Sequence, residues 1–248
     1  MNKLNAFPLD LEYDDGEKKL YFEGVELSPQ VRLLREMESV CLDKEFFAGA
    51  DKNRVQYYMF RGIAKKEDVE LFKSPPLELS YDITIIPAFE LGREFNKTVG
   101  HYHPKSPSGT RYAEIYEVLE GEAHSLQQRL DDETGRVDDV MLVTAKKGEK
   151  IVVPSGYGHN SINPSSKTLV LANITGVFKS EYDPYRLKEG GAYYELIDDS
   201  PVPNEKYPDL PMIKIINAMD LPLNQQFDGD NIYTQFVENP LKFEFLRK

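Results

Sequence analysis

Residues 148–163 read GEKIVVPSGYGHNSIN. The EKIVV run at 149–153 is rich in β-branched residues and is bounded by Gly and Pro, which is typical of a short strand. From residue 77 onward, similar runs alternate with Gly, Pro and Asp turns: LELSYDITIIP, TVGHYH, AEIYEVLEG, HSLQQRL, VDDVMLVTA, EKIVVP and TLVLANIT. DDETG at 131–135 is expected to form a hairpin turn between two of them. Many short strands at regular spacing predict an all-β sandwich or barrel.

Two of the four histidines, His101 and His103, stand in the second run. Residues i and i+2 of a strand point to the same face, so their imidazoles are expected to lie side by side. Such a pair is either a metal-binding pair or two strand histidines with purely structural hydrogen bonds. The residues around them favour the metal.

These segments resemble the cupin superfamily. Its second motif, G-x5-P-x-G-x2-H-x3-N, matches at Gly148, Pro154, Gly156, His159 and Asn163. Its first motif has an H-x-H pair, a spaced Glu and a Gly after six further residues. Here this motif departs in two places: Phe95 stands where the motif has Gly, and residues 104–112 lengthen the gap before the Glu.

The resemblance implies a mainly β cupin fold, a double-stranded β-helix or jelly-roll barrel. It also implies one divalent cation bound by His101, His103, Glu114 and His159. The E-x6-G spacing favours Glu114 over Glu117 or Glu120, and His124 is a competing ligand. Three neutral imidazoles and one carboxylate suit Fe(II), our first choice, and also Mn(II), Ni(II) or Zn(II), and they leave two octahedral positions open.

A tighter resemblance comes from T-x-G-H-x-H at 98–103, A-E-x-Y at 113–116 and the downstream Gln128. These segments resemble the cupin-type glucose-6-phosphate isomerases of archaea and some bacteria, over roughly residues 77–196. Thr84 and Tyr182 also fall where that family has a threonine and a tyrosine over the pocket. The resemblance implies the reversible interconversion of glucose 6-phosphate and fructose 6-phosphate, a reaction of glycolysis and gluconeogenesis.

By the same resemblance, the substrate phosphate is held by hydroxyl and main-chain donors. Such donors bind a dianion without a cluster of cations. The residues are Thr84, Thr98, Gly100 and Tyr116. The nearest cations are Lys97, Lys105 and Arg111, which either assist in binding the phosphate or are only exposed, solubilising charges. Tyr116 is alternatively an aromatic residue of the barrel core.

The implied catalytic residues are Glu114 and Tyr182. In a proton route Glu114 takes the C2 proton and a cis-enediol forms, whereas in a hydride route the C2 hydrogen moves directly to C1. Both routes gain from a Lewis acid. Tyr182 is expected to orient or protonate the sugar oxygens. The sequence leaves the choice between the routes open.

Three other functions compete with the isomerase. A non-haem iron dioxygenase would use the same ligands but has no reason to keep Thr84 and the T-x-G segment. Another sugar isomerase or epimerase of the cupin class is a second alternative. A non-enzymatic storage cupin would be expected to lose metal ligands, and here all four are present.

Outside the barrel, expected over 77–197, the chain has a lead-in at 1–76 and a Pro-rich tail at 198–248, all within a single domain. Ser28-Pro29 is a favourable helix start, and apolar residues then follow at helical spacing, which predicts a helix near 29–43 with Cys41 as a buried structural thiol. VQYYMF at 55–60 predicts a strand. The tail is expected to pack on the barrel or at an oligomer interface.

Composition limits the partners. The net charge of −12 disfavours nucleic acid and anionic membranes, which bind basic surfaces. The single cysteine favours a reducing compartment, and neither an apolar signal region at residues 1–10 nor a run of 18 apolar residues is present. We therefore expect a cytoplasmic protein. The resemblance implies a small sugar phosphate as substrate, and it also implies a homodimer, since cupins with N-terminal strand and helix extensions often pair by sheet addition.

Overall fold

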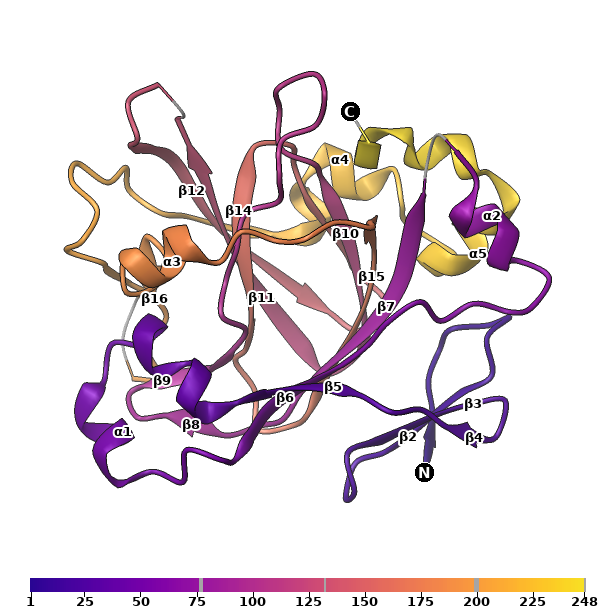
Figure 1. Ribbon diagram of the computed structural model, residues 1–248, viewed down its shortest axis with the longest axis horizontal. Helices are drawn as coiled ribbons and strands as arrows, with labels where there is room; N and C mark the ends of the chain where they lie inside the picture. Colours follow the sequence, from indigo (N-terminus) through magenta and orange to yellow (C-terminus); the bar gives the residue numbers. More distant parts are fainter. Residues whose placement is uncertain (76–77, 132, 199–200, 248) are drawn as a thin grey trace.

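Two β-sheets of six strands face each other and enclose a barrel in this computed structural model (Figure 1). The first sheet contains, in spatial order, β13 (Lys150–Val153), β10 (Glu114–Glu120), β15 (Leu169–Gly176), β7 (Leu79–Ile86), β6 (Val55–Phe60) and β5 (Gln30–Leu33). The second contains β18 (Lys214–Asn217), β12 (Val137–Lys146), β11 (Glu122–Leu130), β14 (Tyr157–Asn163), β9 (Glu94–Lys97) and β8 (Glu90–Leu91). The predicted mainly β cupin fold is confirmed. The structure describes residues 1–75, 78–131, 133–198 and 201–247.

Side chains of the first sheet alternate between two cores. Along β10, Tyr116 and Val118 point into the barrel, where they share a buried cluster with Val143 of the second sheet. Ile115 belongs instead to a cluster outside the barrel. This alternation follows from the two-residue period of a strand, and it explains why β10 is buried on both faces.

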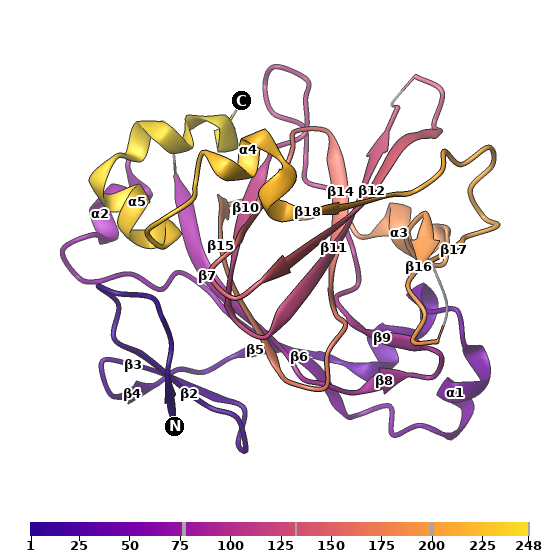
Figure 2. The same ribbon diagram turned by 180° about the vertical axis from the view of Figure 1, so that it is seen from behind.

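The C-terminal tail supplies the second core. It covers the outer face of the first sheet together with α2 (Val69–Lys73); in Figures 1 and 2 the tail is yellow and α2 is purple. Its helices are η3 (Ala218–Asp220), α4 (Pro222–Gln225), α5 (Ile232–Glu238) and η4 (Pro240–Arg247). The ring of Tyr233 lies 5.2 Å from that of Tyr81 on β7. The tail therefore packs on the barrel.

The lead-in also joins the barrel. The strand expected at 55–60 is present as β6, which pairs with β7 and carries β5 on its other edge. Ahead of it lies a four-stranded sheet of β1 (Asn2–Lys3), β2 (Leu11–Asp14), β3 (Lys19–Phe22) and β4 (Val25–Glu26). The expected boundary between lead-in and barrel, at residues 76 and 77, lies outside the described residues. After β15 follow α3 (Asp183–Leu187) and the β16 (Tyr193–Tyr194) and β17 (Val202–Pro203) pair.

The prediction of a helix over residues 29–43 is wrong. Its first part is strand β5, and two 3₁₀ turns follow, η1 (Leu34–Glu36) and η2 (Glu38–Val40), before α1 (Lys44–Gly49). The buried residues Leu34, Met37 and Val40 stand three apart. This spacing resembles an α-helical stripe, but it is also the period of a 3₁₀ helix, whose side chains eclipse at i and i+3.

Cys41 follows η2 and is fully buried. Burial raises the pKa of its thiol to about 12, which keeps the sulfur protonated and fits a structural thiol. The expected turn at 131–135 also forms, since the amide of Asp131 donates to the carbonyl of Arg136 (2.8 Å) and β11 pairs with β12. Asp132 lies outside the described residues. Within the described ranges, no helix combines the length and apolar character that a bilayer crossing requires.

Candidate active site

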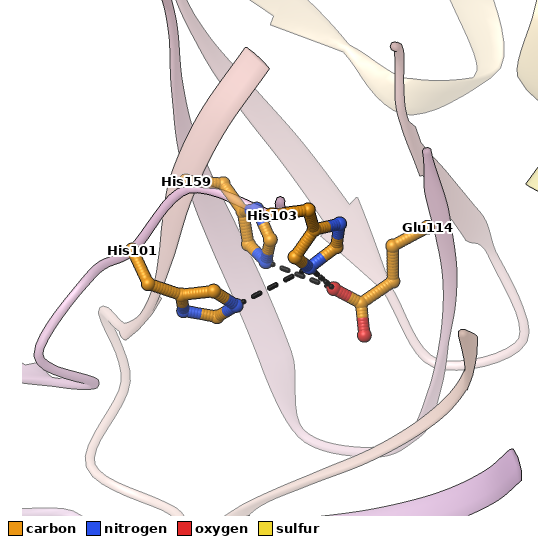
Figure 3. Close-up of side chains that lie close together, drawn as sticks. All are labelled: His101, His103, Glu114 and His159. Atoms are coloured by element: carbon orange, nitrogen blue, oxygen red, sulfur yellow. Dashed lines mark hydrogen bonds and ion pairs between the residues drawn. The ribbon is translucent and has the colours of Figure 1, made fainter. Parts of the chain in front are cut away.

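Four side chains from three parts of the chain converge inside the barrel (Figure 3). His101 and His103 stand between β9 and β10, Glu114 begins β10, and His159 lies in β14. Their potential ligand atoms all lie within 4.8 Å of one another. The backbones of His101 and His159 form an antiparallel bridge, which fixes two of the imidazoles side by side.

The separations between these atoms fit a metal ion. Glu114 Oε2 lies 3.0 Å from His159 Nε2 and 3.2 Å from His103 Nε2, and the Nε2 atoms of His101 and His103 are 3.3 Å apart. Two ligands bound to a cation at about 2.1 Å, at right angles to each other, lie about 3.0 Å apart. The four residues therefore fit neighbouring positions around one divalent cation.

The orientation of His103 supports the same interpretation. Its Nδ1 lies 2.9 Å from the carbonyl of Tyr112, to which it donates, and this contact leaves Nε2 facing the carboxylate of Glu114. Nε2 is therefore the nitrogen that a cation beside Glu114 would bind.

Burial also prepares the ligands electrostatically. It lowers the pKa of His101 well below its usual value and lowers that of His159, so both imidazoles are neutral at pH 7. Burial alone would raise the pKa of Glu114, but the neighbouring His103 and His159 outweigh it and hold that pKa well below its ordinary value. A carboxylate and neutral imidazoles are the protonation states that bind a metal.

A second layer of side chains orients the ligands. Asn173 on β15 donates from Nδ2 to Glu114 Oε1 at 2.8 Å. The hydroxyl of Tyr116 lies 3.0 Å from His159 Nε2. The ring of Phe178 packs 4.7 Å from that of His103 and stacks on Tyr112. Such outer contacts fix ligand orientation in metal sites.

The lengthened segment at 104–112 supports the site. Arg111 donates from Nη1 to the carbonyl of His103 (2.7 Å) and to Glu181 Oε2 (2.6 Å), and its own carbonyl accepts the hydroxyl of Ser155. Tyr112, the last residue of the segment, orients His103. The end of this loop is therefore hydrogen-bonded to His103, one of the four converging residues.

A cavity of about 400 Å³ adjoins the four converging residues. His101, His103 and Glu114 line it. So do the other residues that the sequence points to: Thr84, Thr98, Gly100, Tyr116 and Tyr182. The structure thus places every expected site residue in or beside one cavity.

Individual residues of this set differ in their contacts. The hydroxyl of Thr98 accepts the amide of Ser161 (3.0 Å), while Thr84 is 8% exposed. Tyr116 is also 8% exposed and touches both the cavity and His159, so it is more than core filling. The ring of Tyr182 lies 5.3 Å from that of His101, with the guanidinium of Arg32 at 5.4 Å.

None of the three cations expected to assist, Lys97, Lys105 and Arg111, is among the described residues that line the cavity. Lys97 is buried and paired with Glu94, and Arg111 is committed to Glu181 and His103. Lys105 forms a backbone bridge with Arg111 outside the lining. The competing ligand His124 pairs with Glu195 and is not one of the four converging residues.

Sequence reasoning missed several residues of the cavity, among them Tyr57, Arg61, Asp82 and Asn173. One of these, Asp82, lies on a strand whose alternation was visible: in DITIIP, Asp82 and Thr84 are i and i+2 and share a face. That alternation could have indicated Asp82. Gln128, by contrast, lies outside the lining and binds the hydroxyl of Tyr102 (2.7 Å).

Comparisons with known proteins agree with this geometry. The family model described as glucose-6-phosphate isomerase (GPI) matches residues 31–211. A glucose-6-phosphate isomerase from Thermococcus gammatolerans is 25% identical over 169 residues, which is 68% of this chain and 80% of that protein. One from Pyrococcus abyssi is 24% identical over 151 residues, 58% of this chain and 68% of that protein.

Similar solved structures include an oxalate oxidase bound to glycolate and an oxalate decarboxylase from Bacillus subtilis. The first has a TM-score of 0.35 at 16% identity and covers 48% of this chain and 50% of that one. The second has a TM-score of 0.31 at 19% identity and covers 48% and 25%. Both likenesses are too remote to bear on function. The matched family range, in contrast, begins in β5 and contains all four converging residues and the cavity residues discussed above, Tyr57, Arg61 and Asp82 included.

Proposed function

This chain belongs to the glucose-6-phosphate isomerase (GPI) family, and from this premise we propose that its barrel cavity interconverts glucose 6-phosphate and fructose 6-phosphate around one bound divalent cation. The observation that carries the proposal is the convergence of His101, His103, Glu114 and His159 inside the matched range, with the first three at the wall of the cavity. The reaction is an aldose–ketose isomerisation, so the chain is an enzyme. No separate observation favours a dioxygenase or an epimerase.

The four residues would hold the cation. Fe2+ is the ion we propose, and Mn2+, Ni2+ and Zn2+ are accepted by the same ligand set. Bound there, a divalent cation supplies a Lewis acid that stabilises negative charge developing on the sugar oxygens. The neutral imidazoles and the charged Glu114 match that requirement.

The substrate phosphate is proposed to lie against Thr84, Thr98, Gly100 and Tyr116, all of which line the cavity. Hydroxyls and main-chain amides donate hydrogen bonds to a dianion. Thr98 keeps its donor proton available, since its oxygen acts as an acceptor toward Ser161.

Glu114 and Tyr182 are the proposed catalytic residues. In the proton route Glu114 removes the C2 proton and returns it at C1; Oε1 is held by Asn173 and is thereby fixed in orientation. In the hydride route the C2 hydrogen passes directly to C1, and Glu114 serves as a ligand only. Tyr182, beside His101 at the cavity wall, orients or protonates the sugar oxygens in both.

The reaction would serve glycolysis and gluconeogenesis in the cytoplasm. We also propose a homodimer that forms by addition of sheets, because β5 is an edge strand whose Val31 is 41% exposed. A mass of one chain in solution would contradict the dimer.

The direct test is a coupled assay. Fructose 6-phosphate is supplied, and glucose 6-phosphate formation is followed as NADPH through a glucose-6-phosphate dehydrogenase. We expect NADPH formation that a chelator abolishes and added divalent metal restores. If the protein forms no NADPH with any of the four metals, the proposed isomerase activity is contradicted.

A further inference from the structure

A cation that sequence reasoning did not single out lies in the cavity wall. Arg61 directly follows β6, where Met59 pairs with Thr84 and Phe60 with Ile83 of β7. Continuing this register places Arg61 opposite Asp82. Because i and i+2 share a face, Met59 and Arg61 point into the cavity alongside Thr84 and Asp82, and all four line it.

The guanidinium is held in a built support. Arg61 Nη1 donates to Asp82 Oδ2 at 2.6 Å, and Nη2 lies 3.3 Å from the sulfur of Met59. The side chain of Asp82 is 3% exposed, and its other oxygen accepts the Gly62 amide (2.9 Å) and the Ser80 hydroxyl (2.6 Å). A buried carboxylate with three donors is fixed, so it fixes the arginine.

The guanidinium nevertheless keeps donors for a ligand. Arginine has five N–H donors, and its contacts with Asp82 and Met59 use only part of them. The side chain of Arg61 remains 43% exposed. Its Nη2 lies against Met59, which pairs directly with Thr84, and all three residues line the cavity.

The charge of the cavity fits an anion once a metal is bound. Among the described lining residues, the positive Arg61 and Lys179 balance the negative Asp82 and Glu114. A divalent cation then leaves an excess of two positive charges. A phosphate monoester carries about −1.5 to −2 near pH 7. An unpaired, buried hydroxyl, that of Thr175, lines the same cavity.

We propose that Arg61 is a substrate-binding residue whose guanidinium contacts the phosphate of the sugar phosphate beside Thr84, with Asp82 as its positioning residue. This rests on the proposed function, since it names a further contact in the same site. Arg61 supplies the positive charge that the hydroxyl and amide donors lack. Lys97 and Arg111 do not supply it, because both are paired with carboxylates elsewhere.

The test compares Arg61→Met with Arg136→Met, a control that removes an arginine from an exposed pair with Asp209. KM and kcat for fructose 6-phosphate, inhibition by inorganic phosphate, bound metal and the melting temperature are measured for each. We expect Arg61→Met to raise KM and the inhibition constant of phosphate at least ten-fold, with bound metal unchanged and kcat altered less than three-fold. For the control variant, KM, kcat and the inhibition constant of phosphate should stay within two-fold of those of the unsubstituted protein.

If KM and the inhibition constant of phosphate for Arg61→Met stay within two-fold of those of the unsubstituted protein, the assignment is overturned. If that variant does not fold, Arg61→Gln, which removes the charge but keeps a polar side chain with N–H donors, decides by the same criterion. If the chain does not isomerise the sugar, calorimetric binding of inorganic phosphate to the metal-loaded protein and to Arg61→Gln still decides the role of Arg61. Equal affinities, or no binding by either protein, would overturn it.

Discussion

Glu114→Gln is expected to lower kcat for fructose 6-phosphate by about a thousand-fold or more, the combined scale of lost acid–base and electrostatic assistance. The amide has nearly the same shape and can still accept from Asn173, but it carries no charge. It neither compensates a divalent cation nor removes a proton. Bound metal should therefore fall together with activity.

The matched control is Glu120→Gln. Glu120 lies on the same strand, β10, but is exposed and pairs with Lys147. Exposed pairs of this kind contribute little, so activity and metal content should change less than two-fold. Steady-state kinetics and elemental analysis of both variants make the comparison. Full activity in Glu114→Gln would rule out both roles proposed for this carboxylate.

The second large effect is on stability: Gly100→Ala is expected to destabilise the fold by about 2–5 kcal/mol. Gly100 has a φ of +83°, which costs an L-residue about 1–2 kcal/mol. A Cβ there would lie 2.4 Å from Cδ1 of Tyr185. That ring is fully buried, so it cannot move aside cheaply, and overpacking adds about 1–3 kcal/mol.

Gly148→Ala separates the two causes. Gly148 has a similar φ of +88°, but a Cβ there would meet nothing within 4 Å. It should cost only the backbone strain of about 1–2 kcal/mol. Urea denaturation of both variants, stripped of metal to exclude linkage to binding, measures the difference. Equal losses would show that Tyr185 yields to the added methyl group.

Much of the barrel and of the group of three histidines and Glu114 was visible in the sequence because the pattern there is local. The spacing from Gly148 to Asn163 sets one strand and its turns, and the i, i+2 relation of His101 and His103 sets a shared face. Glu114 joins them through the resemblance to the first cupin motif, in which a Gly follows the Glu after six residues, as Gly121 does here. These relations need no knowledge of which strands pair.

The lead-in shows where local patterns mislead. Leu34, Met37 and Val40 stand three apart, which suits an α-helix as well as a 3₁₀ helix. A long-range pairing excludes the α-helix from residue 29, because β5 is hydrogen-bonded to β6. A single sequence does not show such a pairing.

The cations of the site illustrate the same limit. Lys97 and Arg111 are close to the ligands in sequence, yet each is held by a carboxylate, Glu94 or Glu181. Arg61 is 40 positions from His101 along the chain and reaches the cavity only because β6 pairs with β7. Proximity along the chain was therefore a poor guide to proximity in the cavity.

The most direct test of a single catalytic cation is a titration of the metal-free protein. Fe2+ is added without oxygen in steps of a fraction of one equivalent, and fructose 6-phosphate isomerisation is measured at each step. We expect activity that rises linearly and stops rising at one metal ion per chain, with at most about a thousandth of it in Glu114→Gln. Full activity before any metal is added would contradict it.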